Sequence, residues 1–367
     1  MRLTAWICAG VLFGCGEISA TDERNLSAET PQQAVDACRM LEDTQRRLAC
    51  YDAIPGASVT GGPAEVASAP DTATEPAQDE SRQEDKQSAL RRWIFGSTDG
   101  IPLERSRMTR RWELDNATHG GLLRIRAFNP IYALPARFSS SPNERPESPT
   151  LGPPENPDRL DDIEAKFQFS LKTKLWDNLI GGNGDVWVGF TQQSNWQAYN
   201  TLESEPFRET NYAPEIFTSW RTGLDLAGLR WQMVNLGFIH QSNGESEPFS
   251  RSWNRIYALF GFERGPWEVY VRPWLRVEEE QRDDNPDIED FLGHGDLRLK
   301  WSRNKHDLGL LGRWAPGENR GALQFDWHYP LTGDLKAYLQ VFHGYGETLI
   351  DYNHRQTTIG LGVSLVQ

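Results

Sequence analysis

Polar and apolar residues alternate along most of the chain from about Leu122 onward, in segments separated by turn-rich stretches. In the clearest segment, Glu164–Lys172, every odd position is apolar and every even position is polar. A period of two is typical of β-strands that have one apolar face and one polar face. Twelve segments of this kind are present, centred near Arg126, Gln168, Phe190, Ile216, Leu236, Tyr257, Val271, Leu297, Leu310, Phe325, Leu339 and Leu361.

These twelve segments predict an all-β fold, a twelve-stranded antiparallel transmembrane β-barrel over residues 122–367. The even number fits bacterial barrels, and the segments are close to the ~9–11 residues that a strand needs to cross a bilayer. Trp and Tyr recur at the segment ends, as in an aromatic girdle. A soluble β-sandwich or a lipocalin-like barrel also produces alternation and is the alternative fold.

The first residues predict export from the cytoplasm. Residues 1–20 combine Arg2, an apolar stretch and a small-residue ending at Ala20, which is the pattern of a cleaved signal peptide. The sequence around Cys15 also resembles a lipoprotein cleavage box, although the bulky Phe13 stands where a small residue is usual. We expect cleavage after Ala20, with lipidation of Cys15 as the alternative.

Three further segments precede the predicted barrel. Residues 21–55 are expected to form a short helical periplasmic segment in which Cys38 and Cys50 pair as a disulfide, with two free thiols as the alternative. Residues 56–91 are poor in large apolar side chains and predict a disordered linker. Residues 92–121 are expected to form a periplasmic lead-in to the barrel.

Composition agrees with a barrel and narrows the choice of partners. The chain contains 14 Trp, and beyond the N-terminus no apolar run reaches the roughly 18 residues of a transmembrane helix. A net charge of −14 argues against binding to nucleic acid.

The densest polar cluster lies in one predicted hairpin, residues 237–255. His240 and Ser242 share the otherwise apolar face of the first strand, and Asn254 shares the apolar face of the second. In a barrel these faces point to lipid, where polar groups are costly and therefore suggest function. Arg255 and Tyr257 on the alternate positions would point into the lumen.

The three outward polar residues have the chemistry of a nucleophile, a base and an orienting group. His240 and Ser242 lie two positions apart, about 7 Å between Cα atoms, and Asn254 can accept a hydrogen bond from the other imidazole nitrogen. The simpler alternative is that these residues form hydrogen bonds at the barrel rim and have no catalytic role. A passive porin is the rival function, and a soluble esterase lacks its Gly-x-Ser-x-Gly turn here.

Several long strings resemble the outer membrane phospholipase A family. They are residues 240–244 (HQSNG), 250–255 (SRSWNR), 206–212 (PFRETNY), 283–287 (DDNPD) and 344–353 (GYGETLIDYN). The resemblance extends from about Leu160 to the C-terminus. It implies a calcium-dependent hydrolase that removes acyl chains from the sn-1 and sn-2 positions of glycerophospholipids and from lysophospholipids.

The resemblance also assigns residues to roles. Ser242 is the implied nucleophile, His240 the general base and Asn254 the group that orients His240. The backbone amides of Ser242 and Gly244 are the implied oxyanion donors.

The same resemblance implies two kinds of calcium site. Ser204 and Ser250, through their hydroxyls, and Glu245, through its main-chain carbonyl, are the implied Ca²⁺ ligands. Glu247 and Asp284 correspond to acidic residues of a second site that belongs to the monomer. Solvated rim charge is the alternative for these loop acids.

The family pattern further implies control by reversible homodimerisation. On the strand around Phe190, Gln192 shares the outward apolar face, so a two-fold contact would give its amide a protein partner. The alternative is a glutamine that reaches lipid headgroups. We expect the protein in the outer membrane of a Gram-negative bacterium, with its site at the outer leaflet, membrane phospholipids as substrate and the N-terminal segment in the periplasm.

Overall fold

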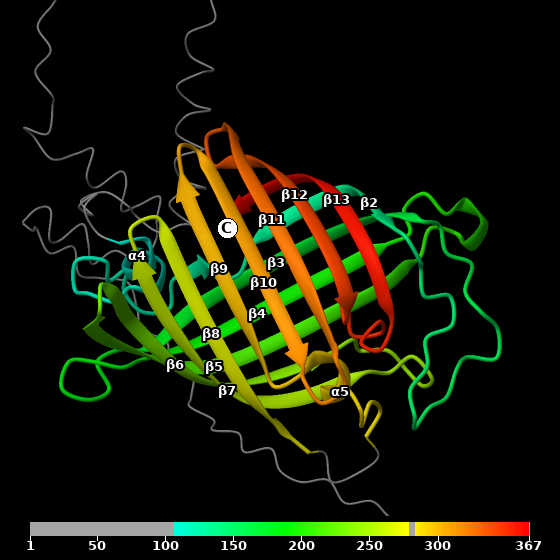
Figure 1. Cartoon of the computed structure of the whole chain (residues 1–367), viewed down its shortest axis with the longest axis horizontal. Helices are drawn as coiled ribbons and strands as arrows, with labels where there is room; N and C mark the ends of the chain where they lie inside the picture. Colours follow the sequence, from blue (N-terminus) through cyan, green and yellow to red (C-terminus); the bar gives the residue numbers. More distant parts are fainter. Residues whose placement is uncertain (1–105, 279–282, 367) are drawn as a thin grey trace, which may run out of the picture. The chain divides into compact units, whose positions relative to one another are not determined.

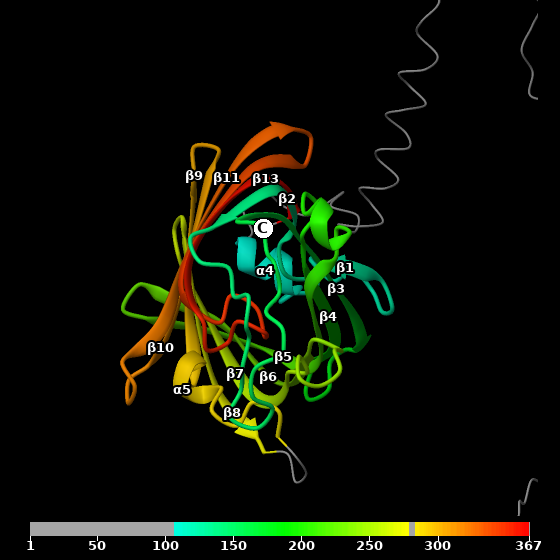
Figure 2. The ribbon, with the colours of Figure 1, turned by 90° about the vertical axis from the view of Figure 1, so that its right-hand side faces the viewer.

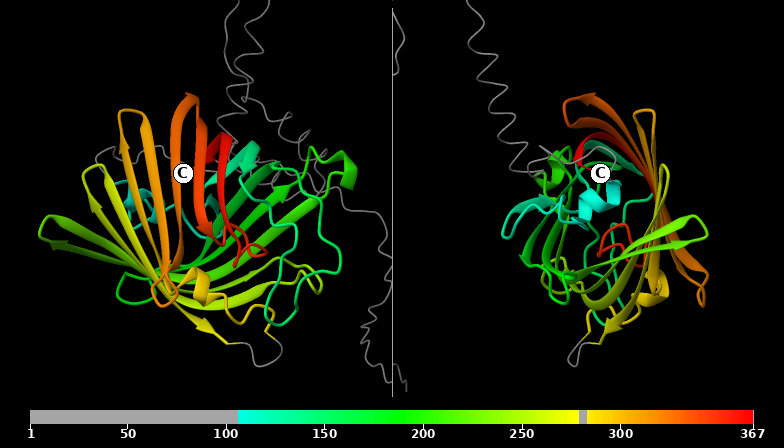
Figure 3. Two further views of the ribbon diagram at one scale, coloured as in Figure 1. Left: turned by 45° about the vertical axis from the view of Figure 1, so that its right-hand side comes forward. Right: turned by 90° about the vertical axis from the view of Figure 1, so that its left-hand side faces the viewer.

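The computed structural model describes residues 106–278 and 283–366 (Figure 1). The expected signal peptide, cysteine-containing segment and linker lie outside these residues. The described chain forms one antiparallel sheet with strand order β1-β3-β2-β13-β12-β11-β10-β9-β8-β7-β6-β5-β4, and a further β3–β4 pairing closes it into a ring. The strands run obliquely around this ring (Figure 3). The predicted twelve-stranded antiparallel barrel is confirmed, with β2 to β13 as its twelve strands.

The strands follow one another around the barrel in chain order. Their bounds are β1 Ile125–Ala127, β2 Ile131–Ser139, β3 Ile163–Trp176, β4 Asp185–Trp196, β5 Phe207–Leu226, β6 Leu229–Ser242, β7 Ser252–Arg264, β8 Trp267–Val277, β9 Gly295–Arg303, β10 His306–Ala315, β11 Arg320–Thr332, β12 Leu335–Tyr345 and β13 Arg355–Val366. The helical elements among the described residues are α4 Arg107–Trp112, η1 Thr201–Glu203 and α5 Glu289–Leu292.

The first predicted strand centre, Arg126, does not lie in β2, the first strand of the barrel. Arg126 lies in the short β1, which pairs with Leu171–Thr173 of β3, whereas β2 pairs with the preceding part of β3 and with β13. The two strands are separated by Phe128, Asn129 and Pro130, and proline cannot donate a ladder hydrogen bond. The other eleven centres fall within β3 to β13.

The two faces of each strand differ in chemistry as the alternation predicted. In β3 the even residues Lys166, Ser170 and Lys172 are buried in the lumen, while Phe169 is exposed on the outside. The lumen is packed with polar pairs, such as Tyr257 Oη donating to Glu215 Oε2 at 2.5 Å. An apolar outer surface around a polar interior is the arrangement of transmembrane barrels.

The two ends of the barrel differ in their connections. At one end, here called the turn end, residues 177–184, 227–228, 265–266, 304–305 and 333–334 join the strands. At the other, the loop end, the connections are residues 140–162, 197–206, 243–251, 278–294, 316–319 and 346–354. The candidate site lies at the loop end, because Ser242 ends β6 there.

A short helix, α4, packs inside the ring of strands at the turn end (Figure 2). Ser106 caps it by accepting a hydrogen bond from the Thr109 amide at 3.0 Å. Met108 and Trp112 are buried among lumen aromatic residues, and Lys172 donates to the Arg111 carbonyl at 2.9 Å. Residues 106–112, which belong to the segment expected to be a periplasmic lead-in, thus pack in the lumen. Along the described chain, no helix has the length and apolar character needed to span a membrane.

Candidate functional site

The site begins with a hydrogen bond between two outward residues of the β6–β7 hairpin. His240 on β6 and Asn254 on β7 are direct register partners. The imidazole Nδ1 lies 2.8 Å from Asn254 Oδ1. An amide oxygen can only accept, so Nδ1 carries a proton and Nε2 of the neutral ring is left as an acceptor. The structure therefore joins two of the three predicted residues.

Ser242 stands on the same outward face, two positions beyond His240. It is the last residue of β6, pairs with Tyr212 of β5 and Ser252 of β7, and is partly buried. Within the described residues its hydroxyl forms no hydrogen bond with the imidazole. Catalytic hydrogen bonds are often long before substrate binds.

The outer surface around these residues is apolar. Leu236 and Ile256, the outward neighbours toward the barrel middle, are 53% and 54% exposed. Phe238 precedes His240 on the same face and is also exposed. His240 and Asn254 thus lie at the loop end of an apolar outer surface. An amphiphile can bind there with its apolar chains against this surface and its polar part beside the two residues.

Gly244 follows the strand in a conformation that suits glycine. Its φ is +71°, and a Cβ there would lie 3.4 Å from the Tyr212 ring. The residue is exposed, and its amide is not engaged in a hydrogen bond with any described residue. A backbone donor beside Ser242 is thereby left for another acceptor.

Asn243, which the sequence analysis did not single out, organises the loop after Ser242. Its side chain donates to the Phe249 carbonyl at 2.8 Å and accepts from the Arg251 amide at 2.9 Å. It also donates to the buried carboxylate of Glu209 at 3.2 Å. The sequence carries no signal for this role, because these contacts depend on how residues 243–251 fold.

Two of the predicted calcium ligands meet across adjacent loops. Ser250 Oγ donates to Asp284 Oδ2 at 2.5 Å. The same loops are joined by the Ser252 amide, which donates to Asn285 Oδ1 at 2.9 Å. This pair of oxygen atoms has the hard donor chemistry that Ca²⁺ prefers, so the residues fit the ion.

The other three candidate ligands are less closely assembled. Glu245 and Glu247 lie in the same 243–251 loop and are exposed. Ser204 lies in the separate 197–206 loop, is exposed, and has no hydrogen bond with the other candidates in the described chain. Among the described residues, no three or more His, Cys, Asp or Glu side chains form a group that could hold a metal ion. The donors are mixed hydroxyl, carbonyl and carboxylate groups spread over three loops.

A buried ion network holds the loop end together behind the site. Glu347, in the 346–354 loop, pairs with Arg137 and with Lys166 Nζ at 2.9 Å. Burial alone would raise the pKa of Glu347, but the charge of Arg137, with that of Lys166, outweighs burial and lowers the pKa below its usual range. The carboxylate therefore stays charged and anchors its loop at neutral pH.

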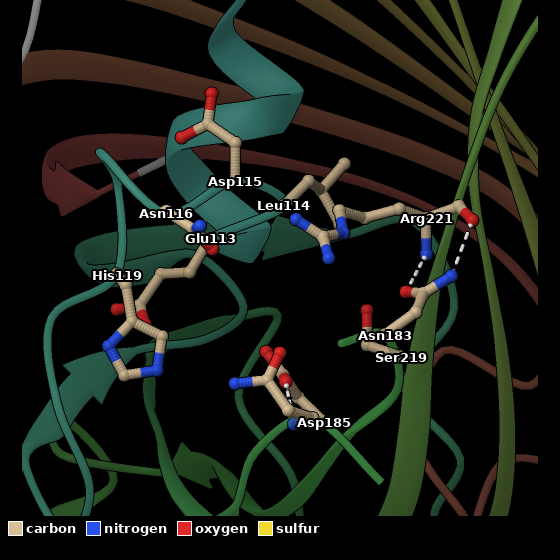
Figure 4. Close-up of a pocket in the computed structure, with 10 residues that line it drawn as sticks. Glu113, Leu114, Asp115, Asn116, His119, Asn183, Asp185, Ser219 and Arg221 are labelled. Carbon is tan, nitrogen blue, oxygen red and sulfur yellow. Dashed lines mark hydrogen bonds between the residues drawn. The ribbon is translucent and has the colours of Figure 1, made fainter. Parts of the chain in front are cut away.

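A polar pocket lies at the turn end of the barrel, away from Ser242 (Figure 4). Glu113 and Asp185 approach it, and both bind Lys174 Nζ, at 3.2 and 2.7 Å. Asn183 donates to the Arg221 carbonyl at 3.0 Å. Glu113 and Asp185 are thus engaged by Lys174. The lining also includes Ser219 and His119, but the His119 imidazole bonds to Asp177 at 2.8 Å and not to Ser219.

The fold and the site define a class of protein, an outer-membrane β-barrel with polar residues set into its lipid-facing wall. A family model described as phospholipase A1 matches residues 108–365. A provisionally named phospholipase A1 of Neisseria meningitidis serogroup B is 40% identical over 343 residues, which cover 89% of each chain. Phospholipase A1 of Escherichia coli K12 is 42% identical over 202 residues, 55% of this chain and 69% of that protein.

Solved structures of outer membrane phospholipase A agree. The E. coli structure has a TM-score of 0.62 at 36% identity and covers 67% of this chain and 93% of its own. The calcium-bound dimer from Salmonella typhi has a TM-score of 0.64 at 34% identity, covering 71% and 98%. The chain therefore belongs to the phospholipase A1 family and is a phospholipase of the Gram-negative outer membrane.

Proposed function

We propose that this phospholipase hydrolyses the sn-1 and sn-2 acyl esters of glycerophospholipids and lysophospholipids with Ser242 as nucleophile, His240 as general base and Asn254 as orienting group. The observation that carries the proposal is the 2.8 Å bond between His240 Nδ1 and Asn254 Oδ1 on the lipid-facing wall, with Ser242 on the same face. An asparagine-to-alanine variant of the related E. coli enzyme is described as an active-site mutant, which supports the role of Asn254.

In this mechanism Ser242 Oγ attacks the ester carbonyl carbon while its proton passes to His240 Nε2. The alcohol part of the lipid leaves with that proton, and water then hydrolyses the acyl-serine by the same route. Asn254 keeps Nδ1 protonated and the ring in place. Because an amide is neutral, it stabilises the imidazolium less than a carboxylate would.

The negative charge that develops on the ester oxygen needs donors. The free amide of Gly244, beside the end of β6, is one proposed donor, and the amide of Ser242 is the other. The positive φ of Gly244 sets the direction of this part of the backbone.

We further propose that Ca²⁺ binds at the loop end. The Ser250 hydroxyl and the main-chain carbonyl of Glu245 would hold it near the oxyanion, with the Ser204 hydroxyl from a second protomer, whereas Asp284 and Glu247 would hold it in the monomer. The 2.5 Å Ser250–Asp284 contact and the calcium-bound S. typhi relative support this site. When bound, the ion would supply positive charge close to the reacting ester.

Reversible homodimerisation is the proposed control. The S. typhi relative is a dimer, and the outward face of β4 carries Val186, Val188, Phe190 and Gln192. Gln192 Nε2 already donates to Ser194 Oγ at 3.3 Å, so its amide has one partner within its own chain. A cross-dimer bond by Gln192 would then add only part of the association energy, and the apolar side chains would supply most of it.

The catalytic assignment is tested by fatty-acid release from detergent-dispersed phospholipid together with labelling by a sulfonyl fluoride. We expect Ser242→Ala to abolish most release and all labelling, while Ser252→Ala, a neighbouring serine on β7, leaves both unchanged. Labelling that maps to Ser246, Ser250 or Ser252 would show that the nucleophile is misassigned.

A further inference from the structure

A second polar group interrupts the outward apolar face on the opposite side of the strand ring, at the β12–β13 hairpin. His343 of β12 and Thr357 of β13 are register partners, and Arg355 is the next outward residue on β13. His343 and Arg355 are exposed. None of these residues belongs to the site around Ser242.

The hydrogen bonds among the three residues fix their protonation. Arg355 Nη2 lies 3.1 Å from His343 Nε2, and His343 Nδ1 lies 2.7 Å from Thr357 Oγ1. A guanidinium can only donate, so Nε2 accepts and the imidazole is neutral. Nδ1 then carries the proton and donates to Thr357, whose own hydroxyl proton is left for another acceptor.

This chain of bonds leaves several donors without acceptors. A guanidinium has about five N–H donors, and no further hydrogen bond or ion pair joins Arg355 to the part of the chain that the structure describes. An arginine beside a hydroxyl donor matches the oxygen atoms of a phosphate group. A cation on the lipid-facing surface of a barrel costs free energy unless an anion neutralises it, and a phosphate group would do so.

The depth of the group and its surroundings indicate an amphiphile. His343 stands two residues before the loop-side end of β12, as His240 does in β6. Leu323, the register partner of His343 on β11, is 51% exposed, and the neighbouring pair Ile359 and Phe138 are 49% and 45% exposed. Phosphate donors therefore lie at the rim above apolar residues that acyl chains can cover.

We propose that Arg355, His343 and Thr357 form a binding site for the phosphate of an outer-leaflet lipid, separate from the catalytic centre. Arg355 and Thr357 donate to the phosphate oxygens, and His343 positions both donors. Leu323, Ile359 and Phe138 contact the acyl chains. Free inorganic phosphate shares the head chemistry but would leave these apolar contacts unmade, so the site selects a lipid.

The test measures binding of a dialkyl-ether phosphatidic acid to the full chain in neutral detergent. This lipid has a phosphate but no acyl ester bond, so binding is measured without hydrolysis of an acyl chain and does not depend on the proposed catalytic mechanism. We expect Arg355→Gln and His343→Leu each to lower the affinity of this site about tenfold. Arg355→Lys, which keeps the charge but loses the fork geometry, falls between.

Arg303→Gln is the matched control, because Arg303 is an exposed, outward arginine at the turn end of β9. An equal loss in this variant would show general attraction of arginine to the micelle and overturn the site. So would unchanged binding in Arg355→Gln, equal binding of the ether lipid without phosphate, or equally strong binding of inorganic phosphate. Mobility of unheated protein on a gel verifies that each variant is folded.

Discussion

At the scale of single residues, function rests on polar side chains in positions that the fold reserves for apolar ones. His240, Ser242 and Asn254 occupy outward positions between exposed leucine, isoleucine and phenylalanine side chains. Such placement costs free energy unless the groups pair, and the His240–Asn254 bond is one such pairing.

The orienting residue is expected to matter less than the nucleophile. Asn254→Ala removes the acceptor at Nδ1 but leaves Ser242 and His240 in place, so we expect a measurable remainder of activity where Ser242→Ala leaves almost none. Asn254→Asp, which restores an acceptor, should recover part of the loss. Rates of fatty-acid release from one phospholipid dispersion compare the three variants, and equal loss in Asn254→Ala and Ser242→Ala would contradict this ranking.

These residues could be predicted because alternation fixes which side chains share a face, and a polar residue on an apolar face is visible in the sequence. The contacts of Asn243 could not be predicted, since they depend on how the 243–251 loop folds back on Glu209. The gap between Ser242 Oγ and the imidazole depends on rotamers that no periodicity encodes.

At the scale of elements, strands were far easier to predict than the short helix and the loops. Eleven of the twelve expected centres lie in the observed barrel strands, because each of these segments alternates polar and apolar residues throughout. The 6-residue α4 is too short to show helical periodicity, and its Met108 and Trp112 are buried by lumen residues distant in sequence. The first centre was misplaced because Phe128–Pro130 separates β1 from β2.

The loops at the loop end carry the calcium prediction. We expect activity to disappear with a chelator and to return with added calcium, because the proposed ion offsets charge on the ester oxygen. Ser250→Ala should raise the calcium concentration needed for half activity, and Asp284→Asn should weaken calcium binding to the monomer. Asp225→Asn, in the exposed end of β5 at the turn end, is the control.

Full activity in excess chelator would contradict the calcium requirement. Calcium titrations of the Ser250→Ala variant that coincide with those of the unmodified protein would remove Ser250 as a ligand while leaving the requirement itself intact.

At the scale of the whole molecule, one wall of the barrel carries the proposed catalytic residues, and the nearby β4 face is the proposed surface for self-association. A phospholipase in a phospholipid membrane needs restraint, and assembly provides it if the site is complete only in the dimer.

Activity and crosslinking should therefore fall together as protein is diluted in mixed micelles at fixed calcium. Gln192→Ala should shift both curves to higher protein concentration by a modest factor, since Ser194 already satisfies part of the amide. Gln168→Ala, on the lumen side of β3, is a control that should leave association unchanged. Constant specific activity while the dimer disappears would contradict this form of control.

The helix inside the lumen has a consequence for passage through the barrel. Inside the lumen, beside a cavity, Tyr257 donates to Glu215 and Lys172 donates to the Arg111 carbonyl, and α4 packs among the lumen aromatics at the turn end. These contacts narrow the turn end of the lumen, and the barrel therefore differs from an open porin channel.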